Sequence, residues 1–235
     1  MFLAASSAGI AAVFGAPFGG VLFAVEAVST YYLVNNYWKG VFTALFGSLF
    51  FYVVRLLHLS SGVDDVYLKL LATQFDPLPF SIAEYALFVV LGVVCGICGA
   101  FFITMTTWFW KLRQSIKILR RGYYIPVLGV AFLTAAVSFP GAPFLNASNI
   151  EAISLLFSTG AITYVESPLM HLSVFVCAKS LLTCAALVLP IPSGVFTPTF
   201  IIGGGLGRFV GEFIKGYIYP NLSTAAGFAV VGAAA

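Results

Sequence analysis

The segment PIPSGVFTP, from Pro190 to Pro198, has the residue types of a site that binds an anion through backbone groups. Its first two prolines end a long apolar run, and Ser193 and Gly194 are residue types that open a new helix. Pro198 suits the first turn of that helix. The first N–H groups of a helix have no partner within the helix and lie at the positive end of its dipole, so they suit an anion. We therefore predict an anion site at residues 193–196.

The composition places this segment in a lipid bilayer. Hydrophobic residues make up 61% of the chain, charged residues 8%, and the mean hydropathy is +1.05; soluble domains carry about 25% charged residues. Because a membrane span takes about 20 residues, we expect an all-α polytopic membrane protein. Nine apolar segments are expected: 2–14, 17–34, 38–57, 81–110, 123–139, 168–189, 195–202, 205–219 and 224–235. Non-helical backbone at membrane depth persists only where protein, water or an ion satisfies it, which favours the anion site over an ordinary loop before a capped helix.

The charged residues indicate membrane topology and few other partners. Basic residues from Lys111 to Arg121 follow segment 81–110, which predicts a cytoplasmic loop there. The preceding loop, residues 59–80, is acidic and is expected outside. Its carboxylates, Asp64, Asp65 and Asp76, with Glu84, could hold calcium, although solvated loop acids are the expected account. A net charge of +3 does not indicate a nucleic-acid partner.

The remaining motifs do not indicate an enzyme, a resident metal or a cofactor. The four cysteines lie in apolar segments, and the Cys95-Gly-Ile-Cys98 motif lacks the strand and helix of a redox site, so we expect packing roles. The glycine run from Gly203 to Arg208 superficially resembles a dinucleotide loop, but no strand precedes it, and close helix packing is expected instead. No cluster of nucleophile, base and acid is present in one segment.

Two long patterns resemble the CLC family of chloride channels and proton-coupled chloride exchangers. PSGVFTP with FIIGGGLGRFVGE resembles the family's GxFxP motif and the helix after it. FGAPFGGVLFAVEAVSTYYLVNNYW resembles the helix pair at the family's dimer interface, particularly in the plasma-membrane and kidney channel branch. The resemblance covers nearly the whole chain and implies an inverted-repeat fold with broken, tilted helices.

The resemblance further implies that the chain is the central part of a CLC transmembrane domain. Residues 1–139 would be the end of the first half and the start of the second, and residues 140–235 would be second-half segments that include the GxFxP motif. The family's central serine and gating glutamate would precede Met1. The pore tyrosine and the CBS domains would follow Ala235.

For the site, the resemblance implies chloride bound by the amides of Val195 and Phe196, with Gly194 keeping the approach open and Ser193 capping the helix. In the exchangers of the family, a proton-carrying glutamate directly follows another glutamate. Here that pair reads Glu26-Ala27, and a methyl group carries no proton. We therefore expect a voltage-gated chloride channel that conducts passively. The alternatives are a chloride/proton exchanger and a non-conducting truncated assembly partner.

The resemblance also implies the setting of the protein. Its partners would be chloride, the lipid bilayer and a second copy of the chain, because residues 17–57 correspond to part of the family's dimer face. The channel branch that the dimer-interface pattern resembles implies a multi-pass protein of the plasma membrane.

Overall fold

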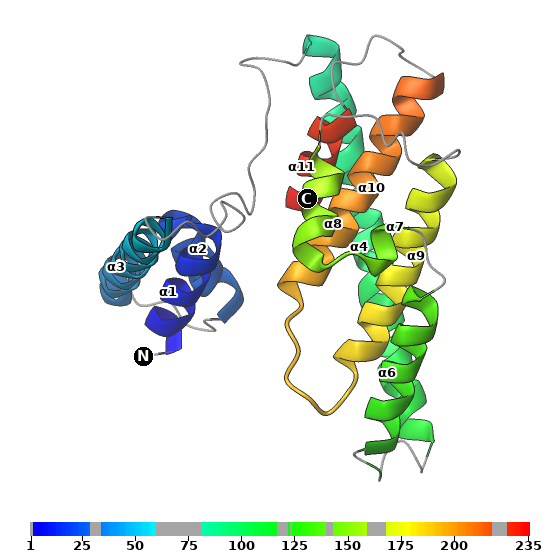
Figure 1. Ribbon diagram of the computed structural model, residues 1–235, viewed down its shortest axis with the longest axis horizontal. Helices are drawn as coiled ribbons and strands as arrows, with labels where there is room; N and C mark the ends of the chain where they lie inside the picture. The colour runs from blue at the N-terminus through cyan, green and yellow to red at the C-terminus, as the bar shows by residue number, and fades with distance from the viewer. Residues whose placement is uncertain are drawn as a thin grey trace. The chain divides into compact units, whose positions relative to one another are not determined.

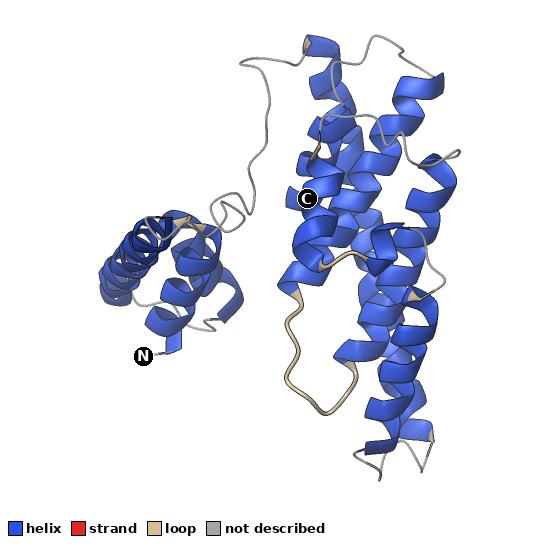
Figure 2. Ribbon diagram, viewed as in Figure 1, coloured by secondary structure: helices blue, strands red, loops and turns tan. Residues whose placement is uncertain are grey.

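The computed structural model describes residues 2–28, 34–59, 81–116, 122, 124–139, 143–158, 168–217 and 225–235. Within these ranges the chain forms helices and short connections and contains no strand (Figure 2). Among the described residues, three helices are long and apolar enough to cross a membrane, at Tyr37–Val54, Glu84–Ser115 and Pro168–Leu187. The expected all-α membrane architecture is thus confirmed. The chain divides into two compact units, Met1–Ala72 and Thr73–Ala235.

The first unit consists of helices α1 (Phe2–Phe14), α2 (Pro17–Phe23), the π-helix η1 (Ala24–Val28) and α3 (Val34–Leu59). Gly15, with a φ of 66°, makes the turn between α1 and α2, a backbone conformation that glycine adopts without strain. The helices pack closely because small residues meet: a Cβ added to Gly20 would lie 2.6 Å from the carbonyl oxygen of Ser7. Ser7 is itself fully buried, and its hydroxyl reaches the Gly40 carbonyl oxygen of α3 at 3.3 Å.

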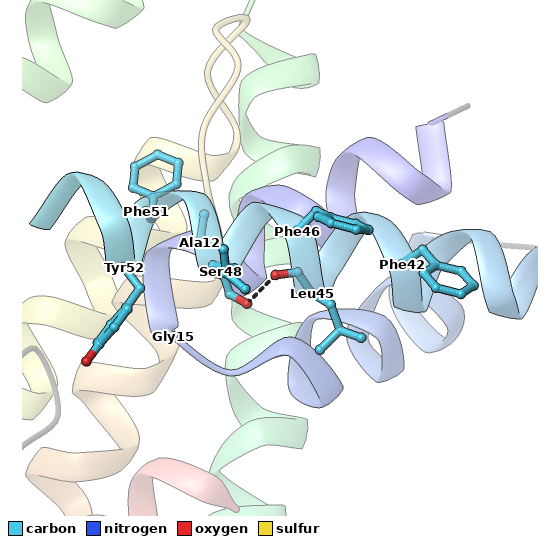
Figure 3. Close-up of a pocket in the computed structure, with 9 residues that line it drawn as sticks. Ala12, Gly15, Phe42, Leu45, Phe46, Ser48, Phe51 and Tyr52 are labelled. Atoms are coloured by element: carbon cyan, nitrogen blue, oxygen red, sulfur yellow. Dashed lines mark hydrogen bonds between the residues drawn. The ribbon is translucent and has the colours of Figure 1, made fainter. Parts of the chain in front are cut away.

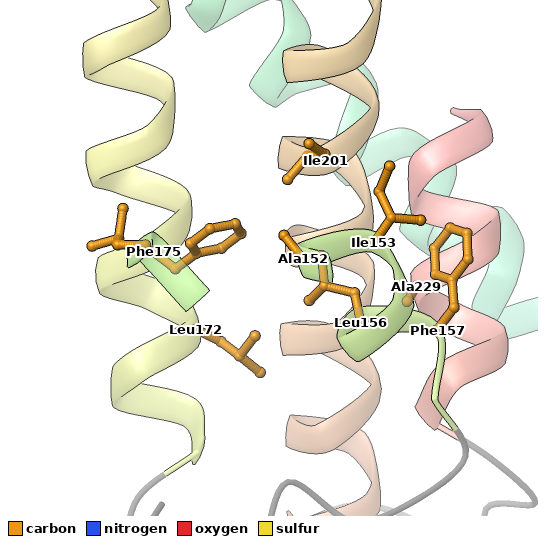
Figure 4. Packing of buried hydrophobic residues seen from close by; sticks show 9 residues of the cluster. Ala152, Ile153, Leu156, Phe157, Leu172, Phe175, Ile201 and Ala229 are labelled. Carbon is orange, nitrogen blue, oxygen red and sulfur yellow. The ribbon is translucent and has the colours of Figure 1, made fainter. Parts of the chain in front are cut away.

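The second unit contains α4 (Ile82–Ser115), α6 (Tyr124–Ser138), α7 (Pro143–Asn146), α8 (Asn149–Phe157), α9 (Pro168–Leu187), α10 (Phe196–Tyr217) and α11 (Ala225–Ala234). Helix α10 packs against α9 on one side and α11 on another, as Figure 1 shows. Side chains of α8, α9, α10 and α11 meet in one apolar cluster around Leu156, Phe175 and Ile201 (Figure 4). Burying this cluster is what holds the short helix α8 against the long ones.

Glycines explain why α10 and α11 approach so closely. A Cβ added to Gly203 or Gly207 would overlap the carbonyl oxygen of Gly232 or Phe228 on α11, respectively, and at Gly211 it would lie 3.0 Å from the carbonyl oxygen of Ala225. The close helix packing expected of the run from Gly203 to Arg208 is therefore confirmed.

Within the second unit, the structure differs from the sequence-based segments mainly in two places. Segments 195–202 and 205–219 are one continuous helix, α10, because the glycines between them pack against α11 and do not break the helix. No helix was expected between segments 123–139 and 168–189, yet α7 and α8 lie there. Helix α8 begins at a capping box that includes Ser148 and Glu151, a signal that sequence reasoning could have used.

Candidate anion site

The site begins with an interruption between two helices. Helix α9 ends at Leu187 and α10 begins at Phe196, and residues 188–195 form the irregular connection drawn in tan in Figure 2. Residues 191–196 are all exposed; the relative exposures are 47% for Val195 and 41% for Phe196. The connection is therefore accessible to an ion.

Hydrogen bonds of Thr199 define the first turn of α10. The amide of Thr199 donates to the Val195 carbonyl oxygen at 3.1 Å, and the Thr199 hydroxyl donates to the carbonyl oxygens of Val195 and Phe196 at 2.9 Å each. Val195 is thus the residue that caps the N-terminus of α10. Ser193 lies two residues before this cap, and its expected capping role stays a prediction. Helices leave their first N–H groups without intrahelical partners, and these groups carry the positive end of the dipole.

A cavity of about 190 Å³ lies beside this connection. That volume holds several waters, each of which takes about 30 Å³ in the liquid. Nothing lies within 4 Å of a Cβ added to Gly194, which leaves the approach at this residue open. The cavity is lined by Thr134, Ser138, Leu145, Asn149, Lys179, Leu182, Thr183, Ala186, Leu187, Ser193, Gly194 and Pro198.

The polar groups of this cavity favour an anion. Its lining includes four hydroxyl groups, one amide and the ammonium group of Lys179, and none of the lining residues carries a carboxylate. The hydroxyl groups of Thr134 and Thr183 donate to carbonyl oxygens of their own helices, each at 2.7 Å. With one positive charge and no negative one, the lining attracts anions and repels cations.

Two arginines form hydrogen bonds between helices around this connection. Arg113, in the last turn of α4, donates through Nη1 to the carbonyl oxygen of Val188, just after α9 ends. A cation there suits the negative end of the α9 dipole. Arg208, 1% exposed within α10, pairs with Glu212 at 3.1 Å and donates to the Ser158 carbonyl oxygen at 2.7 Å.

Arg208 was not among the residues predicted for the site. The signal was present, because an arginine in an apolar helix four residues before a glutamate is a recognisable pair. Lys179 was also missed, since its cavity brings together segments far apart in the sequence.

The other predicted site residues lie in the first unit. Glu26 and Ala27 belong to the π-helix η1, where the Glu26 side chain is exposed. The sequence predicted an ordinary helix over 17–34, and the structure has a π-helix at Ala24–Val28 instead. Such single π turns often occur at functional sites.

A cavity within the first unit does not suit an anion. It has a volume of about 570 Å³ and is lined mostly by apolar and aromatic side chains of α3, among them Phe42, Phe46 and Tyr52 (Figure 3). Its one serine, Ser48, donates to the carbonyl oxygen of Leu45 in the same helix at 2.9 Å. No charged residue is among its described lining residues.

The possible calcium ligands are not brought together in the described residues. Asp64, Asp65 and Asp76 lie outside the described ranges. Glu84 is 1% exposed and accepts a hydrogen bond from the Ser81 amide in the capping box that begins α4. Within the described part of the chain, no group of three His, Cys, Asp or Glu side chains could hold a metal ion.

Comparison with known proteins identifies the family of this arrangement. A model of the voltage gated chloride channel family matches residues 1–235. Chloride channel protein E of Dictyostelium discoideum is 31% identical over 244 residues, which cover 100% of this chain and 24% of that protein. Human chloride channel protein 2 is 30% identical over 272 residues, which cover 100% of this chain and 30% of that protein.

Comparison with solved structures agrees with this family assignment. The crystal structure of a eukaryotic CLC transporter is similar to 99% of this chain with a TM-score of 0.74 and 29% sequence identity, and the match covers 35% of the transporter chain. This chain thus spans less than a third of the length of those two curated relatives.

Proposed function

Because the chain belongs to the voltage-gated chloride channel family, we propose that it forms one side of a chloride pathway in a channel that conducts passively. The observation that carries this proposal is the exposed part of the connection, residues 191–195, which ends where the N-terminus of α10 begins. Chloride would bind there to the amides of Val195 and Phe196. Gly194, with no atom within 4 Å of an added Cβ, leaves space for the ion.

Backbone amides suit conduction better than a bound cation would. An ion that crosses a channel must enter readily and also leave, so several weak contacts serve better than one strong one. The amides at the start of α10 provide partial positive charge that is fixed in place by the helix. The apolar cluster that holds α8, α9 and α10 together would keep these amides in position.

Passive conduction, rather than exchange against protons, is proposed from the residue at position 27. The exchanger of this family requires a carboxylate there, and this chain has Ala27. The preceding Glu26 is exposed in the π-helix η1, where its carboxylate is accessible to solvent. A chloride/proton exchanger remains the second candidate for the complete pathway.

We also propose that the protein is a homodimer of the plasma membrane. Large apolar side chains of α3 are exposed, among them Trp38 (62%), Phe46 (69%) and Phe50 (64%). They lie in residues 17–57, which by resemblance correspond to part of the family's dimer face. A chain that only assembled with a longer subunit, without conducting, would use this same surface.

Flux measurements test the proposal. The chain replaces the matching 272 residues of human chloride channel protein 2, and the chimaera is reconstituted in liposomes alongside the chain alone. We expect chloride flux from the chimaera without uphill proton movement. Coupled proton uptake would make the protein an exchanger. A chimaera that inserts and assembles but carries no chloride would contradict the pathway.

A further inference from the structure

One charged side chain reaches the cavity beside the predicted chloride site. Lys179, on α9, is the single ionisable residue among the described residues that line this cavity with Ser193 and Gly194. We propose that the Lys179 ammonium group attracts the anion into this cavity and that Asn149 holds the ammonium group in place. The inference rests on the proposed chloride pathway and adds to it a residue that sets anion occupancy.

Asn149 is the hydrogen-bond partner of the Lys179 ammonium group. The Lys179 Nζ atom donates to the Asn149 Oδ1 atom at 3.1 Å, a contact between residues 30 positions apart. An ammonium group has three donors, so this bond leaves two for other acceptors or for an ion. The amide oxygen is neutral, and it therefore orients the charge without cancelling it.

The start of α8 gives Asn149 a fixed position. Ser148 and Glu151 form a reciprocal capping box: the Ser148 amide donates to the Glu151 carboxylate at 2.9 Å, and the Glu151 amide donates to the Ser148 hydroxyl at 3.3 Å. Asn149 is the first residue after this cap. The one carboxylate of α8 thus serves the helix start, and it is not among the cavity-lining residues.

The location of Lys179 favours an electrostatic role over a merely structural one. It lies within a helix long and apolar enough to cross a membrane, where a charge is costly and usually functional. If the side chain served only to tie α9 to α8, a neutral donor such as glutamine would do the same without that cost. The two roles therefore differ in whether the charge itself matters.

Two substitutions separate these roles. Lys179→Gln keeps a donor for Asn149 but removes the charge, whereas Lys179→Arg keeps the charge. Lys215→Gln is the matched control, because Lys215 is an exposed lysine of α10 that does not line the cavity. Chloride affinity is measured on the full chain in detergent micelles from the broadening of the chloride-35 NMR signal, with circular dichroism to verify helix content.

We expect Lys179→Gln to weaken chloride binding about tenfold, which corresponds to about 1.4 kcal/mol. Lys179→Arg should stay within about twofold of the parent chain, and Lys215→Gln should not change the affinity. Equal affinity in the parent chain and Lys179→Gln would overturn the inference and leave the proposed pathway intact. Failure of the parent chain to bind chloride would overturn the pathway and the inference together.

If Lys179→Gln does not fold, a second variant tests the proposed role of Lys179. Asn149→Ala retains the charge but removes the amide that orients it. We expect chloride binding to weaken about threefold in this variant. An unchanged affinity would overturn the inference, because the ammonium group would then need no fixed position.

Discussion

Arg208 donates a hydrogen bond at 2.7 Å from within α10 to the carbonyl oxygen of Ser158, the C-cap residue that follows α8. A second bond reaches the carbonyl oxygen of Leu156 at 3.3 Å. The last carbonyl groups of a helix lack intrahelical partners and carry negative partial charge. A buried guanidinium group supplies both the hydrogen-bond donors that these oxygens lack and a positive charge. Through this contact α10, which carries the predicted chloride site, is joined to α8, which carries Asn149.

Replacement of Arg208 by methionine should destabilise the protein by about 3 kcal/mol, since it leaves two carbonyl oxygens and the Glu212 carboxylate without their partner. Thermal unfolding in detergent measures the effect. Glu212→Gln is the matched variant and should cost less, because Arg208 keeps both carbonyl contacts. Equal losses for the two variants would contradict this account of the ion pair.

Gly207→Ala should destabilise the packing of α10 on α11. The added methyl group would overlap the carbonyl oxygen of Phe228 on the neighbouring helix, and the helices would have to separate. A loss of about 1–3 kcal/mol is expected from such overpacking. Gly194→Ala serves as the control, because its methyl group meets no atom within 4 Å and should leave the unfolding temperature unchanged.

Gly194→Leu should impair chloride binding without loss of stability. A leucine side chain would extend into the open space beside the first turn of α10 and obstruct the approach to the amides of Val195 and Phe196. We expect chloride affinity to fall about tenfold or more, with the unfolding temperature retained. A variant that binds chloride as the parent chain does would count against a site at this residue.

The start of α8 should loosen in acid. Hydrogen bonds from the Ser148 backbone and then its side chain lower the pKa of the Glu151 carboxyl below its ordinary value of 4.5. A lowered pKa means that the ionised form stabilises the folded state, so this contribution is present above that ordinary value and is lost as the pH falls through the lowered pKa. The protection factor of the Ala152 amide against hydrogen exchange, which corrects for the pH dependence of the intrinsic exchange rate, should fall over this range in the parent chain but not in Glu151→Gln, because this amide donates to the Ser148 carbonyl oxygen.

Much of the architecture was predictable from local patterns. The apolar run at 2–14 matches α1, and the prolines after Leu189 correctly predicted the interruption before α10. These features depend on residues close together in the sequence. The continuity of α10 was not predicted, because it depends on how its glycines pack against α11. The π-helix η1 was not predicted either.

The site was predictable only in part. The backbone donors at Val195 and Phe196 follow from a motif, and their role as ligands stays a prediction. Lys179 and Asn149 could not be placed beside that motif from the sequence, because no periodicity joins α8, α9 and the connection before α10. Only the tertiary structure brings these three segments around one cavity.

The most direct test of the central claim is the position of a bound halide. Crystals of the protein grown in bromide, which scatters anomalously, would locate the ion without assumptions about transport. The account predicts an anomalous peak within hydrogen-bonding distance of the Val195 and Phe196 amides. A peak confined to other parts of the chain, or none at these amides at saturating bromide, would contradict it.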